Sequence, residues 1–241
     1  TFIDLGLQPI PVKAATGAIG GDLSHEFQII AKTGESELAY DPELVSQNLL
    51  NKSYEEITSM YSASDEMIDK NRSNVVIGRG IEVGHIFNFG TKYTLPLECY
   101  VLNNEGKKVA PYMGSYGVGV SRLTAAIIEA FHDENGIKWP FNVSPFKINI
   151  ISSTQGSNSE VAEKLLEKLT LKYENVSYDD RDLGMGRKIK DSELIGIPWS
   201  IIIGKKYEES KQLEITNRSN GEKLFLTESE VESFEFEQYA P

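Results

Sequence analysis

Apolar and polar residues alternate along much of residues 1–140, which is the pattern of half-buried strands. A glycine-dense turn at residues 16–22 precedes the first such strand. A helix is predicted from about Val120, with Gly136 as its stop. The pattern predicts strands at residues 27–31, 75–77, 81–89, 97–102 and 107–112. Gly78 and Gly80 are expected to join the strand at 75–77 to the strand at 81–89, and a hairpin turn at 103–106 is expected to join the last two strands.

Residues 40–74 interrupt this alternation. The segment is rich in Asn and Ser, and it holds only short helical patterns such as the one at residues 54–61. Clusters of small polar residues between periodic segments are typical of loops. We therefore predict a surface insertion or linker here.

A different pattern begins after Trp139-Pro140 and Ser144-Pro145, where apolar runs alternate with amphipathic stretches. It predicts an α/β domain over residues 144–241, separate from an antiparallel sheet with helices over residues 1–143. The predicted elements of the second domain are a strand at 147–151, a helix capped by Ser159, a helix at 187–194, a buried apolar strand at 199–203, strands at 212–217 and 222–226, and a last helix with a capping box of Thr227 and Glu230. The predicted fold class is therefore α+β followed by α/β.

Composition adds limits on what the chain can bind. The 241 residues are 40% hydrophobic, enough for real cores, and the net charge of −12 excludes a uniformly basic surface, so any nucleic acid must bind locally. No apolar run approaches the roughly 18 residues of a membrane span. Cys99 is the single cysteine, which favours a reducing compartment, by default the cytoplasm. Because Thr1 stands where a start methionine would be, we expect the protein to continue upstream.

Three glycines precede a single arginine in residues 113–122, at a predicted junction of strand and helix. Glycines let a flat ligand lie against a strand, and the Arg122 guanidinium can pair with phosphate or stack on a base. A tight packing point between sheet and helix would need the same glycines. The residues alone leave both interpretations open.

His85 lies in a predicted strand whose alternation places Val83, His85 and Phe87 on one face and Glu82 on the other. An imidazole beside an aromatic ring can line a small pocket. The alternative is a half-buried histidine that hydrogen-bonds a carbonyl group. The sequence does not decide between them.

His25 and Glu26 follow the glycine-dense turn. Two possible ligands are too few for a dedicated metal site, so we expect a capping role for this pair and assign no metal site in the chain.

A basic loop stands out in the acidic second domain. Residues 181–190 hold Arg181, Arg187, Lys188 and Lys190 against Asp182 alone. Such a loop at the start of a helix suits contacts with phosphates or base edges, and it equally suits a solvated helix face.

Taken together, these motifs resemble the C-terminal part of a bacterial-type prolyl-tRNA synthetase. The matching motifs are TGAIGGDLSHEF at 16–27, GIEVGHIF at 80–87, GTKY at 90–93, GSYGVGVSR at 114–122, Trp139-Pro140, Pro145-Phe146, DDR at 179–181 and ELIGIP at 193–198. The resemblance spans nearly the whole chain. It implies a partial class II synthetase antiparallel sheet with helices, followed by an α/β anticodon-binding domain.

The resemblance also implies an activity and its residues. The family forms prolyl adenylate from proline and ATP, with magnesium bound to the substrate, and then transfers proline to tRNA(Pro). It implies ATP binding by Arg122, Gly117, Gly119 and Glu26, with Arg122 as the catalytic residue that stabilises phosphate charge. It implies a proline pocket of His85, Phe87 and Ser115. It implies anticodon binding by Arg181, Arg187 and Lys188.

Two expected features of the family are missing from the sequence. The first two class II motifs would precede Thr1, and only residues 40–74 stand in the place of a large editing domain, too few for an independent hydrolytic domain. We therefore expect an incomplete catalytic unit that is inactive alone, whereas the full-length parent is expected to be a homodimer. The alternative is a non-catalytic RNA-binding module derived from a synthetase.

Overall fold

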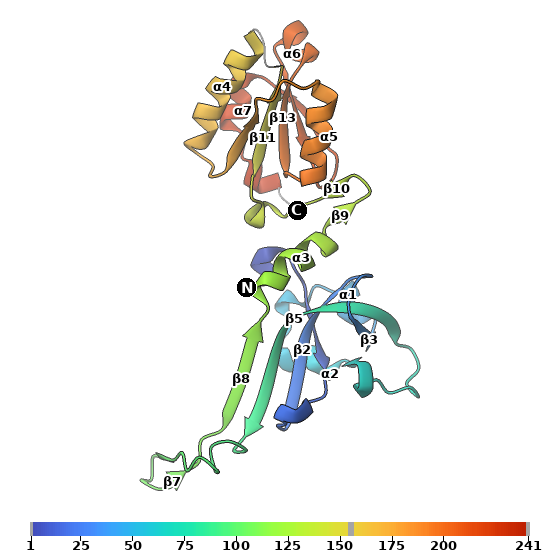
Figure 1. The fold of residues 1–241 in the computed structure, drawn as a ribbon, viewed down its shortest axis with the longest axis vertical. Coiled ribbons are helices and arrows are strands. Elements are labelled where there is room, and N and C mark those ends of the chain that lie inside the picture. Colours follow the sequence, from blue (N-terminus) through green and yellow to red (C-terminus); the bar gives the residue numbers. More distant parts are fainter. Residues whose placement is uncertain (1, 154–156, 240–241) are drawn as a thin grey trace. The chain divides into compact units, whose positions relative to one another are not determined.

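The computed structural model describes residues 2–153 and 157–239 and contains two compact units, Thr1–Ala130 and Phe131–Pro241 (Figure 1). The second unit begins before the predicted boundary at residue 144 because it includes a short hairpin of β9 (His132–Asp133) and β10 (Gly136–Ile137). Arg218 holds this hairpin to the rest of the unit through two hydrogen bonds to the Asp133 carboxylate, of 2.8 and 2.6 Å.

The first unit is built on a six-stranded sheet in the order β2-β1-β4-β3-β5-β8. The strands are β1 (Ile10–Lys13), β2 (Leu23–Ile30), β3 (Ser36–Tyr40), β4 (Ser62–Ser64), β5 (Val76–Gly90) and β8 (Met113–Val118). Because β2 pairs with β5 as well as with β1, the sheet closes on itself, and β8 is left as an extra strand on β5.

The two strands predicted at 75–77 and 81–89 are one continuous strand, β5. Gly78 and Gly80 do not break it, because their lack of a side chain serves close packing. A Cβ atom on Gly80 would lie 2.4 Å from Cδ1 of Leu38 and 2.6 Å from Oε1 of Gln28. The glycines therefore make room for buried side chains of neighbouring strands.

The prediction of a surface insertion at 40–74 was wrong for the part that enters the sheet. This segment contains α1 (Glu43–Ser46), α2 (Tyr54–Ser59) and β4, which pairs with both β3 and β1. The Ser62 hydroxyl donates a hydrogen bond to the Pro11 carbonyl at 2.6 Å. The segment supplies part of the core cluster of this unit, which is Ile10, Val12, Leu38, Tyr40, Leu44 and Leu49.

A short hairpin and a helix complete the first unit. The predicted hairpin is confirmed as β6 (Val101–Leu102) and β7 (Lys108–Val109), shorter than expected. The predicted helix is α3 (Val120–Ala130), which buries Leu123, Ala126 and Ile127. It ends at Ala130, so Gly136 is not its stop and instead lies in β10 with φ of 139°.

The second unit is a five-stranded sheet in the order β12-β11-β13-β14-β15. The strands are β11 (Ile148–Ser152), β12 (Val176–Asp179), β13 (Trp199–Ile203), β14 (Leu213–Asn217) and β15 (Lys223–Leu226). The helices are α4 (Ser157–Thr170), α5 (Met185–Ile195), α6 (Lys205–Ser210) and α7 (Glu228–Ser233). Strands β12, β11 and β13 are parallel, whereas β14 and β15 are antiparallel to their neighbours. Figure 1 shows α4 and α7 on one face and α5 on the other.

Most of the predicted local signals of this unit are confirmed. The buried strand spans the predicted residues, and its Trp199 and Ile201 lie in the apolar core beneath α4 and α7. The capping box of Thr227 and Glu230 is present. Ser159 lies inside α4 and is not its cap. Among the described residues, no helix is long and apolar enough to cross a membrane.

Candidate functional site

Polar side chains from β2 and β5 gather on one face of the first unit. In the register of the two strands, Glu26 lies opposite His85 and Gln28 lies opposite Glu82. One residue of β5, Val83, lies between Gly84 and Glu82, whereas their partners Phe27 and Gln28 are adjacent, so Val83 is the extra residue of a β-bulge.

The bulge corrects the predicted facing of the strand. Simple alternation predicted that Glu82 and His85 point to opposite faces. Because an extra residue shifts the alternation by one, Glu82 shares a face with His85 and Phe87. The Glu82 carboxylate Oε1 lies 3.1 Å from His85 Nδ1.

His85 is held on three sides. Its ring stacks on Phe87, with ring centroids 4.1 Å apart and an angle of 19° between the planes. Its Nε2 atom lies 2.6 Å from the hydroxyl of Ser24, which is buried, and its Nδ1 atom faces Glu82. The predicted neighbourhood of His85 and Phe87 is therefore present, and the imidazole is fixed rather than free to rotate.

Glu26, Glu82 and His85 form the cluster at the centre of this face. Their nearest ligand atoms all lie within 4.8 Å of one another. Gln28, which is fully buried, donates a hydrogen bond from Nε2 to Glu26 Oε2 at 2.8 Å, and its Oε1 has no partner among the described residues. Two carboxylates and an imidazole can bind an organic ammonium group or a metal cation.

Because His25 and Glu26 lie within β2 and not at a helix end, the predicted capping role of this pair was wrong. His25 is not part of the cluster. It is adjacent to Glu26 on β2 and therefore points to the opposite face. Its Nδ1 lies 2.8 Å from the Tyr54 hydroxyl, and burial, with Lys13 and His85 nearby, lowers the pKa of His25.

Strand β8 brings Ser115 and Gly117 beside the cluster. Ser115 lies opposite Phe87, and Gly117 lies opposite His85. A Cβ atom on Gly117 would meet no atom within 4 Å, so the space above this position is open. A ligand can therefore approach the backbone of β8 beside the imidazole.

Arg122, in the first turn of α3, reaches the same cluster. The N–H of Gly119, just before the helix, donates to the carbonyl of Val83 at 3.0 Å and so ties the start of the helix to the bulge. Arg122 Nη1 donates to the Glu82 carbonyl at 3.0 Å and pairs with carboxylate oxygens of Glu35 at 3.3 Å and Glu82 at 3.5 Å. The guanidinium is 47% exposed, so it can also meet a ligand.

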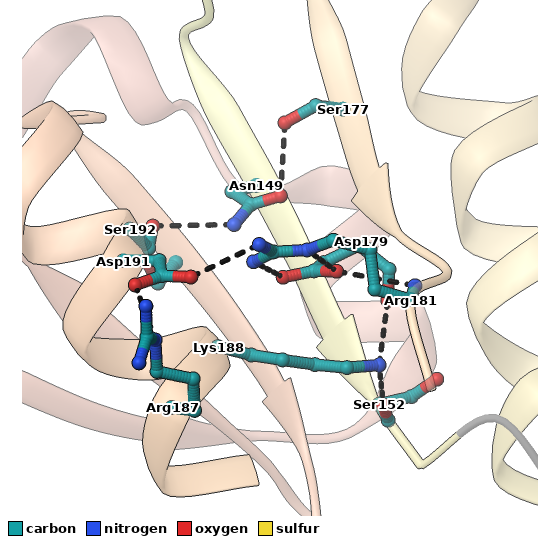
Figure 2. Close-up of polar contacts among 10 residues, drawn as sticks. Asn149, Ser152, Ser177, Asp179, Arg181, Arg187, Lys188, Asp191 and Ser192 are labelled. Carbon is teal, nitrogen blue, oxygen red and sulfur yellow. Dashed lines mark hydrogen bonds and ion pairs between the residues drawn. The ribbon is translucent and has the colours of Figure 1, made fainter. Parts of the chain in front are cut away.

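The basic loop of the second unit forms a network of ion pairs (Figure 2). Arg181 binds Asp179 through two hydrogen bonds, of 2.8 and 2.7 Å, and its Nη1 lies 3.0 Å from Asp191. Arg187 also binds Asp191, at 3.0 Å. The Arg181 guanidinium holds the pKa of Asp179 below its usual value. Positive charge in this loop is therefore largely neutralised, and Arg187, 71% exposed, is the more accessible arginine.

Lys188 is completely buried, which argues against its predicted contact with an anticodon. Its ammonium group donates to the backbone carbonyls of Ser152 and Asp179, at 2.9 and 2.8 Å, so it joins the ends of β11 and β12 (Figure 2). A helix repeats every 3.6 residues, so Lys188 faces the sheet while its neighbour Arg187 faces outward.

Polar side chains also lie beneath α5. Asn149 donates to Ser192 at 3.2 Å and accepts from Ser177 at 2.9 Å, and the hydroxyls of Ser192 and Ser200 are 3.0 Å apart. A pocket of about 260 Å³ opens beside this row and is lined in part by Phe146, Asp179 and Arg181.

The sequence analysis did not assign Ser24, Gln28 or Glu82 to the polar cluster on β2 and β5. Ser24 lies within the matched motif at 16–27 and could have been found there. Glu82 was hidden by the bulge, because no local pattern marks Val83 as the extra residue.

Comparisons with known proteins show what the chain is similar to. Residues 143–236 match the family described as anticodon binding domain, starting close to the boundary predicted from the sequence. Proline–tRNA ligase from Wolbachia sp. subsp. Drosophila simulans (strain wRi) is 46% identical over 226 residues, which cover 92% of this chain and 53% of that protein. The ligase from Ehrlichia canis (strain Jake) is 43% identical, covering 97% of this chain and 55% of that protein.

The fold agrees with these matches. The solved structure of prolyl-tRNA synthetase from Cryptosporidium parvum, complexed with halofuginone and AMPPNP, has a TM-score of 0.69 at 16% identity, and the match covers 96% of this chain and 40% of that one. The chain spans about half the length of the curated relatives that it matches. Residues 143–236 are therefore similar to anticodon binding domains, and nearly the whole chain is similar to part of proline–tRNA ligases.

Proposed function

We propose that this chain supplies the proline, ATP and anticodon sites of a proline–tRNA ligase. In that reaction a carboxylate oxygen of proline attacks the α-phosphorus of ATP and pyrophosphate leaves. A ribose hydroxyl of tRNA(Pro) then attacks the prolyl carbonyl and AMP leaves. The observation that carries the proposal is that His85, Glu82 and Arg122 meet on one face in a homologue of such ligases.

The cluster suits both the apolar carbons and the charged nitrogen of the proline ring. The pyrrolidine ring is apolar, and the stacked rings of His85 and Phe87 offer it a flat wall, with Ser115 opposite Phe87. The secondary ammonium group is cationic, and the carboxylates of Glu26 and Glu82 can accept its hydrogen bonds. We expected Glu26 to bind ATP, but its place in the cluster supports contact with the ammonium group, because a carboxylate repels phosphate.

Arg122 suits the phosphates of ATP. Its ion pairs with Glu35 and Glu82 are partly exposed and therefore weak, so a polyphosphate can compete for the guanidinium. Gly117 and Gly119 leave the adjacent backbone free of side chains that would block the nucleotide. Magnesium belongs to this proposal only as the ion that accompanies ATP.

The second unit is proposed to bind the anticodon of tRNA(Pro). Arg181 lines the pocket of about 260 Å³, and Arg187, which is 71% exposed, pairs with Asp191 of the same lining. Residues 179–223 contain nine basic and nine acidic residues, so this segment is neutral in a chain of net charge −12. A neutral segment in an acidic protein fits the docking of one stem-loop and not indiscriminate binding. Translation takes place in the cytoplasm, where we place the protein.

The test is ATP–pyrophosphate exchange in a chimeric ligase, in which this chain replaces the matching region of the Wolbachia (wRi) relative. We expect proline-dependent exchange from the chimera and none from the chain alone. Arg122→Ala should lower the exchange rate by ~10²-fold or more with little change in the proline KM, because the guanidinium acts on phosphate charge. His85→Ala should instead raise the proline KM and leave the ATP KM nearly unchanged.

A chimera that folds and binds tRNA(Pro) but never exchanges pyrophosphate would contradict the catalytic proposal. It would support the second candidate, a non-catalytic RNA-binding module, which the family match of residues 143–236 favours taken by itself. The molar mass of the active chimera tests the proposed homodimer.

A further inference from the structure

We propose that Glu82 couples proline binding to ATP binding, because its carboxylate faces the place assigned to the proline ammonium group and also pairs with Arg122, which is assigned to ATP. This inference rests on the proposed function. Glu82 Oε1 lies 3.1 Å from His85 Nδ1, and Glu82 Oε2 lies 3.5 Å from Arg122 Nη1. The backbone carbonyl of Glu82 accepts a further hydrogen bond from the same nitrogen of Arg122 at 3.0 Å. One residue therefore joins the imidazole to the guanidinium.

The bulge at Val83 makes this double contact possible. Without the extra residue, Glu82 would face away from His85. The same bulge anchors α3, because the Val83 carbonyl accepts the N–H of Gly119, three residues before Arg122. Bulges commonly turn a side chain toward a functional site. Here the bulge sets the positions of Glu82 and of the helix that carries Arg122.

Glu82 also selects the tautomer of His85. A carboxylate only accepts hydrogen bonds, so the proton of the neutral imidazole lies on Nδ1. Nε2 then carries the lone pair, and the hydroxyl of Ser24, at 2.6 Å, donates to it. The ring thus faces Phe87 in one defined orientation and tautomer.

The sign of the coupling follows from the charges. With no nucleotide bound, Arg122 neutralises part of the Glu82 carboxylate. When phosphates draw the guanidinium toward themselves, the carboxylate is left more negative and binds the proline ammonium group more tightly. ATP should therefore raise the affinity for proline, and by linkage proline should raise the affinity for ATP by the same factor. We expect a factor of about 10, within the usual range of such couplings.

The first measurement needs no substrate and uses the 241-residue chain. The chain has three histidines, His25, His85 and His132, so ¹⁵N–¹H spectra of the imidazoles at alkaline pH can be assigned with His85→Ala. We expect the Nδ1–H tautomer for His85. Glu82→Gln keeps an acceptor and should keep this tautomer, whereas Glu82→Ala should let the Nε2–H form appear.

The second measurement is the dissociation constant of proline in the chimeric ligase, with and without the α,β-methylene analogue of ATP, which cannot form the adenylate. Glu82→Gln removes the charge and should reduce the coupling factor from about 10 to near 1. Glu35→Gln is the matched control, because Glu35 pairs with Arg122 but has no role at His85, and it should keep the coupling.

The outcomes separate the two proposals. A wild-type chimera that binds neither ligand overturns the proposed function, while the spectra still decide whether Glu82 sets the tautomer. A chimera that binds both ligands with equal coupling in wild type and Glu82→Gln overturns the coupling role. An Nε2–H tautomer in the wild-type chain overturns the contact itself. If Glu82→Ala fails to fold, Glu82→Gln carries the coupling test.

Discussion

Arg187 and Lys188 are adjacent basic residues with opposite environments. The Arg187 side chain is 71% exposed and pairs with Asp191, whereas Lys188 is fully buried and binds two backbone carbonyls. A buried ammonium group persists only where hydrogen bonds replace its hydration. At the scale of the residue, the two side chains therefore serve different purposes, one at the surface and one inside the fold.

Lys188→Met should destabilise the second unit by about 2 kcal/mol, because the carbonyls of Ser152 and Asp179 lose a charged donor. Both tryptophans, Trp139 and Trp199, lie in this unit, so urea unfolding followed by tryptophan fluorescence reports on it directly. Lys190→Met, at an exposed position, is the control and should change stability by less than about 0.5 kcal/mol. Equal effects of the two substitutions would refute the interior role of Lys188.

Arg187→Ala should weaken binding of tRNA(Pro) while leaving the fold intact. If Arg187 contacts a phosphate, affinity for cognate and anticodon-mutated tRNA should fall alike, and the salt slope should flatten by about one. If it reaches a base edge, the loss should be selective for the cognate anticodon. Arg181→Ala should lower the affinity for tRNA(Pro) further, since it also leaves Asp179 and Asp191 without their shared cation.

Binding measured at two salt concentrations with both tRNAs distinguishes these cases. Unchanged binding by both variants would show that the loop is a solvated face.

At the scale of the element, the β9–β10 hairpin is held by the ion pair of Asp133 with Arg218. Arg218, with a side chain only 10% exposed, binds both carboxylate oxygens of Asp133 and also the Gly136 carbonyl. Its hydrogen bonds hold the pKa of Asp133 far below the usual range, and Lys138 adds to this effect. The ion pair therefore ties the hairpin to the turn after β14.

This ion pair predicts a pH dependence. Because the pKa of Asp133 is lower in the folded state, its contribution to stability is present above the unfolded pKa of about 4 and is lost as the pH falls below it. Asp133→Asn should therefore reduce the urea midpoint at pH 7, and the gap to wild type should shrink as the pH falls below about 4. Asp180→Asn, at an exposed position, is the control. A gap that stays constant with pH would contradict the role of this carboxylate.

At the scale of the whole molecule, one surface is apolar and unpaired. Strand β8 is the last strand of its sheet, and all six of its residues are exposed (Figure 1). Tyr116 is 85% exposed and Tyr112, just before the strand, is 84% exposed. An exposed apolar edge strand is a template for pairing with another strand.

The isolated chain should accordingly self-associate as its concentration rises. Tyr116→Lys, which adds a charge to the edge, should reduce this association. Leu171→Lys is the matched control, because Leu171 is 90% exposed but lies in the other unit and in no strand. Light scattering over a range of concentrations measures the effect. Association that only Leu171→Lys reduces would exclude β8 as the interface.

The sequence by itself determined what local periodicity encodes. It located α5, the buried strand β13, the hairpin of β6 and β7, and the capping box of α7, because each depends on residues close together in the chain. It also brought His85, Phe87 and Ser115 into one predicted pocket through the resemblance, and the register of β5 with β8 places them side by side.

The tertiary structure decided what depends on pairing between distant segments. Strand β4 joined the sheet although its residues look like a polar linker, because β1 and β3 supply its hydrogen bonds. The bulge at Val83 turned Glu82 toward His85, and packing of α5 on the sheet buried Lys188 while Arg187 stayed exposed. Strand register and burial are set by partners far away in the sequence, so no local pattern could have placed these side chains.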